Sequence, residues 1–319
     1  MTSALVSNDP ALAAFAELVG DDGPVTVRGS GTRWELGGLV DPEATVVSAP
    51  VGVVDHIPAE MTVTVRAGTT VAQLQEVLGG AGQRTALPGR GGTVGGAVAV
   101  GENGLYPRGT GTVAASVLQV RYVSAEGRLV TAGGPTVKNV TGFDLPRLMT
   151  GSLGTLGLLA EITLRTNPIP GLSCWLEAEA VDPFAVNDLL LHPSAVLADD
   201  ARVWVLLEGH AADVEAESRR LATLGTFVER DGPPPLPEHR WSLPPAALRD
   251  VVAGAADGAT GPEPGSGPFV ASIGVGHLWA SQPQPPRPLD PVTQSINGRL
   301  KSNFDPTGRL NPGRTLGRP

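Results

Sequence analysis

The chain has 319 residues, enough for more than one domain, and its hydrophobic content of 41% and charged content of 17% are typical of a globular protein. The net charge of −9 argues against non-specific nucleic-acid binding, so we expect no nucleic-acid partner. The single cysteine, Cys174, excludes an intramolecular disulfide, a cysteine-ligated iron–sulfur cluster and a structural zinc site of the usual kind.

The sequence contains no signal for membrane insertion. Residues 1–20 include acids and lack the basic start of a signal peptide. No apolar run reaches the roughly 20 residues that a helix needs to cross a bilayer. We therefore expect a cytoplasmic protein, for which membrane association would come only through a partner.

The first predicted elements lead into a turn suited to an anion. Apolar spacing predicts an amphipathic helix over residues 10–19, and Val25–Arg28 is a predicted strand. This strand runs into Gly29-Ser30-Gly31-Thr32, which offers two hydroxyl groups and mobile backbone amides. It is not a Walker loop, because no Gly-Lys-Ser or Gly-Lys-Thr follows. The candidate binding residues here are Arg28, Gly29, Ser30, Gly31 and Thr32.

Two strands and a helix are predicted next. The strands cover residues 45–49 and 61–66, the second with the apolar–polar alternation of a half-buried strand. Thr69 or Thr70 can cap the helix, and Gly79-Gly80 ends it.

A second glycine-rich loop, at residues 88–99, is the feature around which the chain is organised. Its five glycines within residues 88–96 allow positive φ angles and a close approach of backbone to ligand, so that the amides can bind a pyrophosphate. An ordinary glycine-rich turn between two elements is the alternative interpretation. The candidate binding residues are Pro88, Gly89, Gly92, Thr93, Gly95 and Gly96.

Further along, the chain alternates strands with short polar or glycine-rich segments. Residues 117–123 are a predicted strand. Asp144 is expected either to cap a short helix at 146–149 or to hold a loop against a bound ligand. Gly151–Gly157 then leads into another predicted strand at 158–165.

Four motifs occur in an order that is specific, although each is weak alone. They are Val65–Thr69, Gly92–Gly96, Val137–Leu145 and Gly151–Gly157. Together they resemble the FAD-binding domain of the vanillyl-alcohol oxidase and p-cresol methylhydroxylase family, and within it the FAD-binding subunits of glycolate oxidases. The resemblance covers about residues 25–170. It implies further cofactor contacts at Gly151, Ser152, Gly154, Gly157 and Ile162.

The resemblance implies an α+β fold, in which a two-subdomain FAD-binding domain of the p-cresol methylhydroxylase type precedes a smaller α+β cap domain. The break at Asn167–Gly171 places the FAD-binding domain at residues 1–170 and the cap at 171–301. Strands and helices interleave in the cap, which favours a small antiparallel sheet with helices on one face. A match in the tail implies that residues 302–319 return to the FAD-binding domain, where Asn311 contacts the cofactor.

The cofactor and partners follow from the same resemblance. Some family members tether FAD through a histidine, but residues 80–110 contain none, so we expect non-covalent FAD. The implied reaction is oxidation of glycolate or a related 2-hydroxy acid, with flavin N5 accepting hydride from the substrate C2. Because the chain cannot ligate a cysteine-bound cluster, electrons are expected to pass to partners, namely a homologous flavoprotein subunit and an iron–sulfur subunit.

Two residues are catalytic candidates, Lys138 and His277. Lys138 presents its ammonium either to an anion or to solvent. His277 lies in a predicted strand over residues 269–279, where it either packs with a satisfied ring nitrogen or lines a cleft. Related dehydrogenases carry a histidine- and acid-rich metal motif in this strand, whereas residues 272–279 hold one histidine and no acid. We therefore expect no metal.

Departures from the family pattern leave a rival function open. Ala114-Ala115 stands where many relatives have an Arg-Asp pair, and the metal motif is absent. Both departures favour a non-catalytic FAD-binding assembly subunit that stabilises a catalytic homologue. A stand-alone flavin reductase using a nicotinamide is a further alternative, but Gly109–Ala114 lacks the strand–turn–helix context of a dinucleotide fingerprint.

Overall fold

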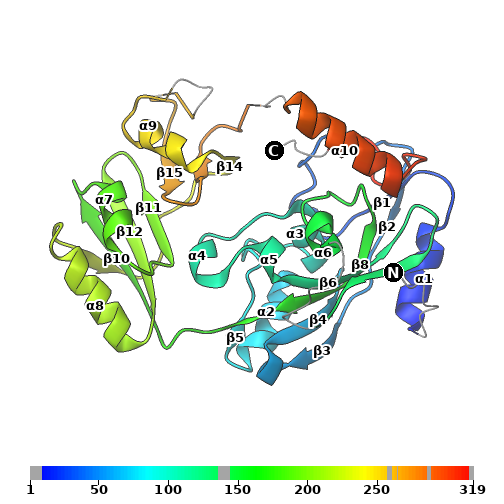
Figure 1. The fold of residues 1–319 in the computed structure, drawn as a ribbon, viewed down its shortest axis with the longest axis horizontal. Coiled ribbons are helices and arrows are strands. Elements are labelled where there is room, and N and C mark those ends of the chain that lie inside the picture. The colour runs from blue at the N-terminus through cyan, green and yellow to red at the C-terminus, as the bar shows by residue number, and fades with distance from the viewer. Residues whose placement is uncertain (1–8, 136–143, 257–260, 264, 286–288, 316–319) are drawn as a thin grey trace. The chain divides into compact units, whose positions relative to one another are not determined.

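The computed structural model describes residues 9–135, 144–256, 261–263, 265–285 and 289–315, which are arranged in two compact units (Figure 1). The first unit comprises residues 1–104, 112–169 and 287–318, and the second comprises residues 105–111 and 170–286. The chain therefore passes between units at Ile169 and Pro170, next to the break that the sequence predicts. The mixture of helices and antiparallel sheets is the α+β class that the motifs imply.

The first unit is built on a five-stranded antiparallel sheet. Its strand order is β3 (Val53–Ile57), β4 (Thr62–Arg66), β8 (Leu158–Arg165), β6 (Val117–Val123) and β7 (Leu129–Gly133). Two smaller pairings accompany it: β1 (Val25–Val27) with β2 (Thr45–Val47), which are parallel, and β5 (Gln83–Arg84) with β9 (Asn167–Pro168).

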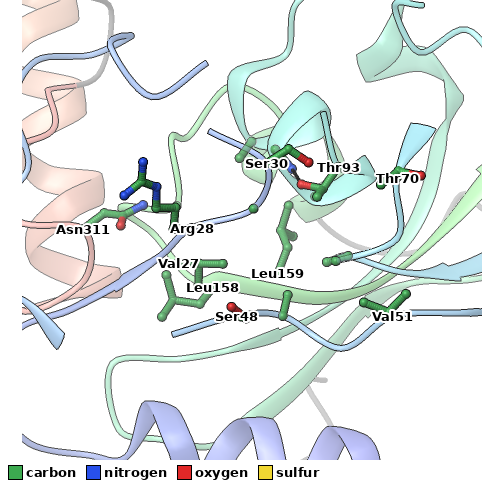
Figure 2. Close-up of a pocket in the computed structure, with 18 residues that line it drawn as sticks. Val27, Arg28, Ser30, Ser48, Val51, Thr70, Thr93, Leu158, Leu159 and Asn311 are labelled. Carbon is green, nitrogen blue, oxygen red and sulfur yellow. Dashed lines mark hydrogen bonds between the residues drawn. The ribbon is translucent and has the colours of Figure 1, made fainter. Parts of the chain in front are cut away.

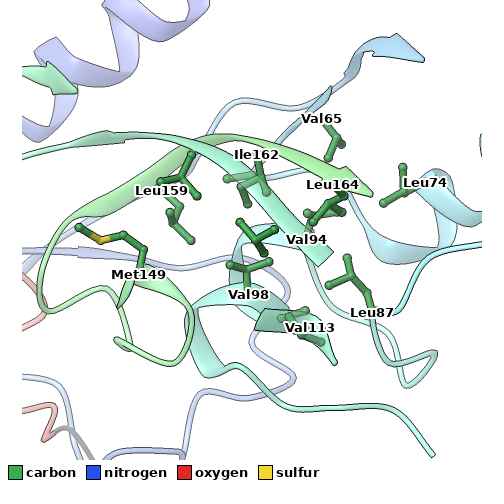
Figure 3. Packing of buried hydrophobic residues seen from close by; sticks show 14 of the residues in the cluster. Val65, Leu74, Leu87, Val94, Val98, Val113, Met149, Leu159, Ile162 and Leu164 are labelled. Atoms are coloured by element: carbon green, nitrogen blue, oxygen red, sulfur yellow. The ribbon is translucent and has the colours of Figure 1, made fainter. Parts of the chain in front are cut away.

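Helices cover this sheet because alternate strand residues are apolar on one face. Val65 and Ile162 lie opposite each other in the register of β4 and β8, and both are fully buried. They pack with Leu74, Val94 and Val98 of the helices in the main core of the unit (Figure 3). The helices of the unit are α1 (Pro10–Val19), α2 (Val71–Gly79), α3 (Val94–Val100), α5 (Val113–Ser116), α6 (Leu145–Met149) and α10 (Pro291–Phe304), with a short 3₁₀ helix, η1 (Pro58–Glu60).

The caps predicted at Thr70 and Asp144 are confirmed, and a further cap lies at Asp290. Thr70 caps α2 in a capping box with Gln73, and the Asp144 carboxylate accepts a hydrogen bond from the Arg147 amide at the start of α6. Asp290 caps α10, accepting bonds from the amides of the second and third helical residues.

Helix α3 differs from the prediction of an extended loop over residues 88–99. Thr93 begins it as the N-cap, its Oγ1 accepting a hydrogen bond from the Gly96 amide at 3.2 Å. Gly95 packs directly on the strand-to-helix turn at Ala67, where an added Cβ would lie 2.7 Å from the Ala67 Cβ. Gly95 therefore serves the close packing of a helix.

The C-terminal segment belongs to the first unit from α10 onward, so the expected boundary after residue 301 falls inside a helix. Leu300 and Phe304 pack against the main core of this unit. Lys301 Nζ donates to the carbonyl oxygen of Thr155 at 2.9 Å and to that of Leu310 at 3.1 Å. These contacts bind α10 and the tail to the same body as the glycine-rich loops.

The second unit contains a seven-stranded antiparallel sheet. Its strand order is β13 (Val228–Arg230), β10 (Leu172–Glu179), β12 (Arg202–Gly209), β11 (Ala195–Ala198), β15 (Phe269–Ser272), β16 (His277–Ala280) and β14 (His239–Ser242). One face packs on α7 (Pro183–Leu189), α8 (Ala211–Leu221) and α9 (Leu248–Val252), which η2 (Pro245–Ala247) precedes. The other face carries the tryptophans Trp175, Trp204 and Trp279, against which Leu105 and Tyr106 pack beside α4 (Pro107–Thr110).

One strand predicted for the second unit is wrong. Residues 269–279 form a hairpin of β15 and β16 rather than one strand. Gly274 and Gly276 have φ angles of +79° and +88° in the connection, and a Cβ on Gly276 would lie 2.3 Å from the Leu243 carbonyl oxygen. Only glycine fits this turn, which the apolar character of the run conceals.

Candidate functional site

A cavity of about 310 Å³ lies in the first unit among the ends of several elements (Figure 2). It is bounded by the segment after β1, the segment after β2, the turn from β4 to α2, the N-terminus of α3, the start of β8 and the tail. The lining residues are Val27, Arg28, Gly29, Ser30, Ser48, Ala49, Val51, Ala67, Gly68, Thr70, Thr93, Gly95, Gly96, Ala99, Gly154, Leu158, Leu159 and Asn311. A smaller cavity of about 90 Å³ shares Gly29, Ser30, Thr93, Gly96 and Asn311 with it.

The two glycine-rich loops predicted separately form one wall of these cavities. A Cβ on Gly29 would lie 2.5 Å from Thr93 Oγ1, and a Cβ on Gly92 would lie 2.5 Å from Thr32 Oγ1. Gly31 and Gly92 also have positive φ angles, of +76° and +90°. Because real Cβ atoms do not approach other atoms so closely, the two loops can pack this tightly only with glycine at positions 29 and 92.

The third loop and the tail complete the cavity together. Asn311, at a φ of +44°, accepts a hydrogen bond from the Thr26 hydroxyl and donates from Nδ2 to the Leu153 carbonyl oxygen at 2.5 Å. A Cβ on Gly154 would lie 2.5 Å from that Nδ2 atom. The predicted return of the tail brings Asn311 to the cavity wall.

Several predicted residues line neither cavity. Pro88 and Gly89 lie outside both, and Gly151 donates its amide to the Val98 carbonyl oxygen at 3.0 Å. Ser152 is buried and accepts a hydrogen bond from the Gly154 amide. Gly157 packs against a tyrosine, with an added Cβ 2.4 Å from Tyr122 Cδ2.

Ile162, another predicted contact, lines neither cavity. Its side chain is fully buried in the core between the sheet and its helices. From the same strand, Leu158 and Leu159 line the larger cavity instead. A contact between Ile162 and the cofactor stays a prediction.

Sequence reasoning missed two parts of the wall, residues 48–51 and 67–70. Gly68 explains their contact: its amide donates to the Pro50 carbonyl oxygen at 2.8 Å, and a Cβ would lie 2.2 Å from the Ala49 carbonyl oxygen. The glycine of the Val65–Thr69 motif was an available signal. Residues 48–51 carry no comparable feature.

Arginines gather beside the loop of residues 29–32. The guanidinium groups of Arg28 and Arg314 lie 5.0 Å and 4.9 Å from the centroid of the Trp34 ring. Arg33 is buried and pairs with Glu102 at 2.9 Å. The electrostatic environment of this loop is thus suited to an anion.

Of the two catalytic candidates, Lys138 and His277, the structure describes only His277, because Lys138 lies outside the described residues. His277, on β16 of the second unit, is 6% exposed, and its Nε2 lies 2.9 Å from Arg240 Nη2. Burial, followed by the charge of Arg240, lowers the pKa of His277 to about 4. Since a guanidinium only donates, Nε2 is the acceptor and the proton of the neutral ring is on Nδ1.

The described residues contain no group of three or more His, Cys, Asp or Glu side chains placed to hold a metal ion. None of the helices in the same part of the chain is long and apolar enough to span a membrane.

The cavity chemistry fits a dinucleotide. Gly29, Gly95 and Gly96 line it with backbone and no side chain, which leaves their amides accessible to a ligand. Ser30 and Thr93 add hydroxyl groups to that wall, and nearby arginines add positive charge. Val27, Leu158 and Leu159 supply an apolar surface for a flat ring.

Residues 4–133 match the family model described as "FAD binding domain". This part of the chain is therefore an FAD-binding domain, and FAD is its cofactor. The resemblance to flavoprotein subunits that the four motifs indicate is confirmed. The chain is 34% identical over 212 residues to the glycolate oxidase subunit GlcE of Escherichia coli, an alignment that covers 63% of this chain and 60% of that one.

Other relatives match shorter regions. A D-lactate dehydrogenase of Archaeoglobus fulgidus is 33% identical over 150 residues, which is 46% of this chain and 33% of that one. The glycolate oxidase subunit GlcD of Bacillus subtilis is 30% identical over 148 residues, which is 44% and 31% respectively. The chain thus spans less than two thirds of the length of each of these relatives.

Solved structures confirm the fold class. An alkyldihydroxyacetonephosphate synthase aligns with a TM-score of 0.66 over 94% of this chain and 73% of that one, at 14% identity. BBE-like 1 of Physcomitrella patens aligns with a TM-score of 0.60 over 96% and 88%, at 16% identity. At such identities the likeness concerns the fold alone.

Proposed function

We propose that this chain is the FAD-binding subunit of a glycolate oxidase or related 2-hydroxy-acid dehydrogenase complex. The observation that carries the proposal is the alignment over 212 residues with a glycolate oxidase subunit. A glycine-walled cavity suited to FAD in the same chain supports it. When bound, FAD would supply the oxidant that accepts hydride from the substrate carbon.

The residues of this chain would bind, orient and shield the cofactor. The backbone amides of residues 29–32 and 92–96 would hold its anionic part, assisted by the hydroxyls of Ser30 and Thr93. Leu158 and Leu159 would exclude water from the opposite wall. Non-covalent attachment is part of this proposal, because residues 80–110 offer no histidine as a tether.

Partner subunits complete the proposal. Two of the relatives are glycolate oxidase subunits by name, which supports an assembly of homologous flavoprotein chains. One cysteine cannot ligate an iron–sulfur cluster, so electrons that arrive here would leave through a partner that carries one. Any membrane association would come through the same partners.

A non-catalytic role is the second candidate, and the environment of His277 favours it. A histidine with a pKa of about 4 is a weak base at neutral pH and would take little part in removing the substrate hydroxyl proton. In this alternative the chain binds FAD and stabilises a catalytic homologue.

Anaerobic stopped-flow mixing with glycolate and D-lactate distinguishes these functions. We expect the isolated FAD-loaded chain to be reduced slowly or not at all, and the reconstituted complex to be reduced rapidly with this chain's flavin participating. Bleaching of the flavin band within milliseconds by the isolated chain would contradict the need for a partner. A complex that stays fully active when this chain is loaded with a redox-inert flavin analogue would favour the non-catalytic role.

A further inference from the structure

Arg33 is a buried arginine, and one nitrogen of its guanidinium group has no hydrogen-bond partner among the described residues. It follows the loop of residues 29–32 directly, and its side chain is 4% exposed. Nε pairs with Glu102 Oε2 at 2.9 Å, while Nη1 donates to the Gly91 carbonyl oxygen at 2.9 Å and to Thr32 Oγ1 at 3.2 Å. Within the described residues, Nη2 is shielded from solvent and has no hydrogen-bond partner. A buried donor without an acceptor is rare unless a ligand supplies one.

The charge around Arg33 is not balanced by its ion pair. Glu102 also pairs with Arg90, whose Nε lies 3.1 Å from the same carboxylate oxygen and whose side chain is 45% exposed. Two guanidinium groups thus share one carboxylate, and these three side chains carry one net positive charge. The Arg33–Glu102 pair is buried and the excess positive charge lies with the half-exposed Arg90, so the edge of this loop attracts anions while Arg33 offers a free donor beneath it.

The position of Arg33 connects it to the FAD cavity. It lines the smaller cavity together with Gly29, Ser30 and Gly31, and the first two of these also line the larger one. A Cβ on Gly92 would lie 2.6 Å from Arg33 Nη1, so the second glycine loop leaves room for the guanidinium as well. Backbone amides, Thr32 and Arg33 are therefore neighbours at one anion cradle.

We propose that Arg33 binds the pyrophosphate of FAD, with Nη2 donating a hydrogen bond to a phosphate oxygen. The pyrophosphate is the anionic part of the cofactor, and a guanidinium is the side chain best matched to phosphate oxygens. This inference rests on FAD binding by the chain and not on the proposed oxidation of a 2-hydroxy acid. Glu102 and Gly91 are positioning groups in this arrangement, because they hold the other nitrogens.

Titration of the apo-protein with FAD, ADP and riboflavin tests the proposal. The variant Arg33→Met removes the charge at similar length, and Arg90→Met is the matched control because it removes the other partner of Glu102. We expect Arg33→Met to weaken FAD and ADP binding by about ten- to a hundredfold, and Arg90→Met to weaken it less than about threefold. Riboflavin, which lacks phosphate, should bind both variants as it binds the wild type.

Four outcomes would overturn the proposal: wild-type FAD affinity in a folded Arg33→Met, an equal loss in Arg90→Met, an equal loss of riboflavin binding, or a salt dependence of FAD affinity unchanged by Arg33→Met. Circular dichroism monitors folding. If Arg33→Met does not fold, Arg33→Lys is the test variant, because lysine keeps the positive charge but lacks the several N–H donors of the guanidinium group. We expect Arg33→Lys to bind FAD a few-fold more weakly, and unchanged affinity would contradict a direct contact. A wild-type chain that bound no FAD would instead refute FAD binding itself.

Discussion

Individual glycines of the cavity wall differ in what they support. Gly95 lies against the backbone of Ala67, whose carbonyl oxygen would be 2.9 Å from an added Cβ. Gly96 is less crowded, since the nearest atom to its added Cβ is Thr93 Oγ1 at 3.1 Å. Both glycines line the larger cavity, but Gly95 is needed for packing against Ala67, whereas a side chain at Gly96 would be crowded only by Thr93 and by a bound ligand.

This difference predicts unequal effects of valine at the two positions. Gly96→Val should abolish FAD binding with a loss of stability below about 1.5 kcal/mol, whereas Gly95→Val should also destabilise the first unit by about 1–3 kcal/mol through overpacking. Flavin content per chain and urea unfolding measure the two effects. Gly298→Ala is the control, because nothing lies within 4 Å of its added Cβ. Wild-type flavin content in Gly96→Val would contradict the assignment of the α3 N-terminus to the cofactor.

His277 should make the stability of the second unit depend on pH. Its pKa is lowered from 6.5 to about 4 by burial and by Arg240. The unfolded chain therefore binds a proton between these values that the folded chain does not, and stability is lost as the pH falls from about 6.5 to 4. The loss from this residue should be about 2–3 kcal/mol at pH 4.5 relative to pH 7.

Urea unfolding of the wild type and of His277→Gln at both pH values isolates this contribution. Tryptophan fluorescence is a convenient probe, because the rings of His277 and Trp279 meet edge to face with centroids 6.3 Å apart. An identical pH dependence in the two proteins would show that His277 does not titrate as its surroundings indicate.

At the scale of elements, the local sequence pattern predicts several strands and helix caps, whereas helix α3 depends on tertiary packing. The alternating Thr62–Arg66 run and the capping residues Thr70 and Asp290 carry their signals in the local sequence. Helix α3 does not, because glycines at its second and third positions disfavour helix unless packing against Ala67 compensates. The local sequence of each glycine loop predicts a separate anion-binding turn. The two loops form one cavity wall only through contacts between residues about sixty positions apart, which no local pattern encodes.

Thr93 caps helix α3 and also lines the cavity, so its substitution should affect both helix stability and cofactor binding. Thr93→Ala removes the cap of α3 and a hydroxyl of the cavity, so we expect a loss of about 1 kcal/mol in stability together with weaker FAD binding. Thr93→Ser should preserve both. Thr112→Ala is the matched control, because Thr112 caps α5 in the same way and lines neither cavity. Equal FAD affinity in Thr93→Ala and Thr112→Ala would limit Thr93 to a structural role.

At the scale of the whole molecule, the tail is an integral part of the FAD-binding unit. Arg309 is 5% exposed and donates hydrogen bonds to five backbone carbonyl oxygens, those of Val19, Gly20, Asp22, Gly23 and Ala125. Leu310 forms a parallel bridge with Val25, directly before Asn311 reaches the cavity. Two segments that are far apart in sequence thus meet at the cavity that we assign to FAD.

Removal of this guanidinium should loosen the tail and the cofactor together. Arg309→Met leaves five carbonyl groups without this donor, those of Val19 and Ala125 in buried surroundings, so we expect a loss of about 3 kcal/mol in stability and a marked fall in FAD affinity. The control is Arg299→Met, an exposed position on α10. Thermal unfolding with and without added FAD measures both quantities. An Arg309→Met chain that retained wild-type affinity for FAD would mean that the tail is not needed to close the cavity.

Acid precipitation of the purified chain tests the central claim most directly, which is that the first unit holds FAD non-covalently. Trichloroacetic acid should release the flavin completely, with close to one FAD per chain in the supernatant after reconstitution and none in the protein pellet. Flavin that stays with the pellet would contradict non-covalent binding. A folded chain that takes up no FAD at all would contradict the assignment of the cavity to this cofactor.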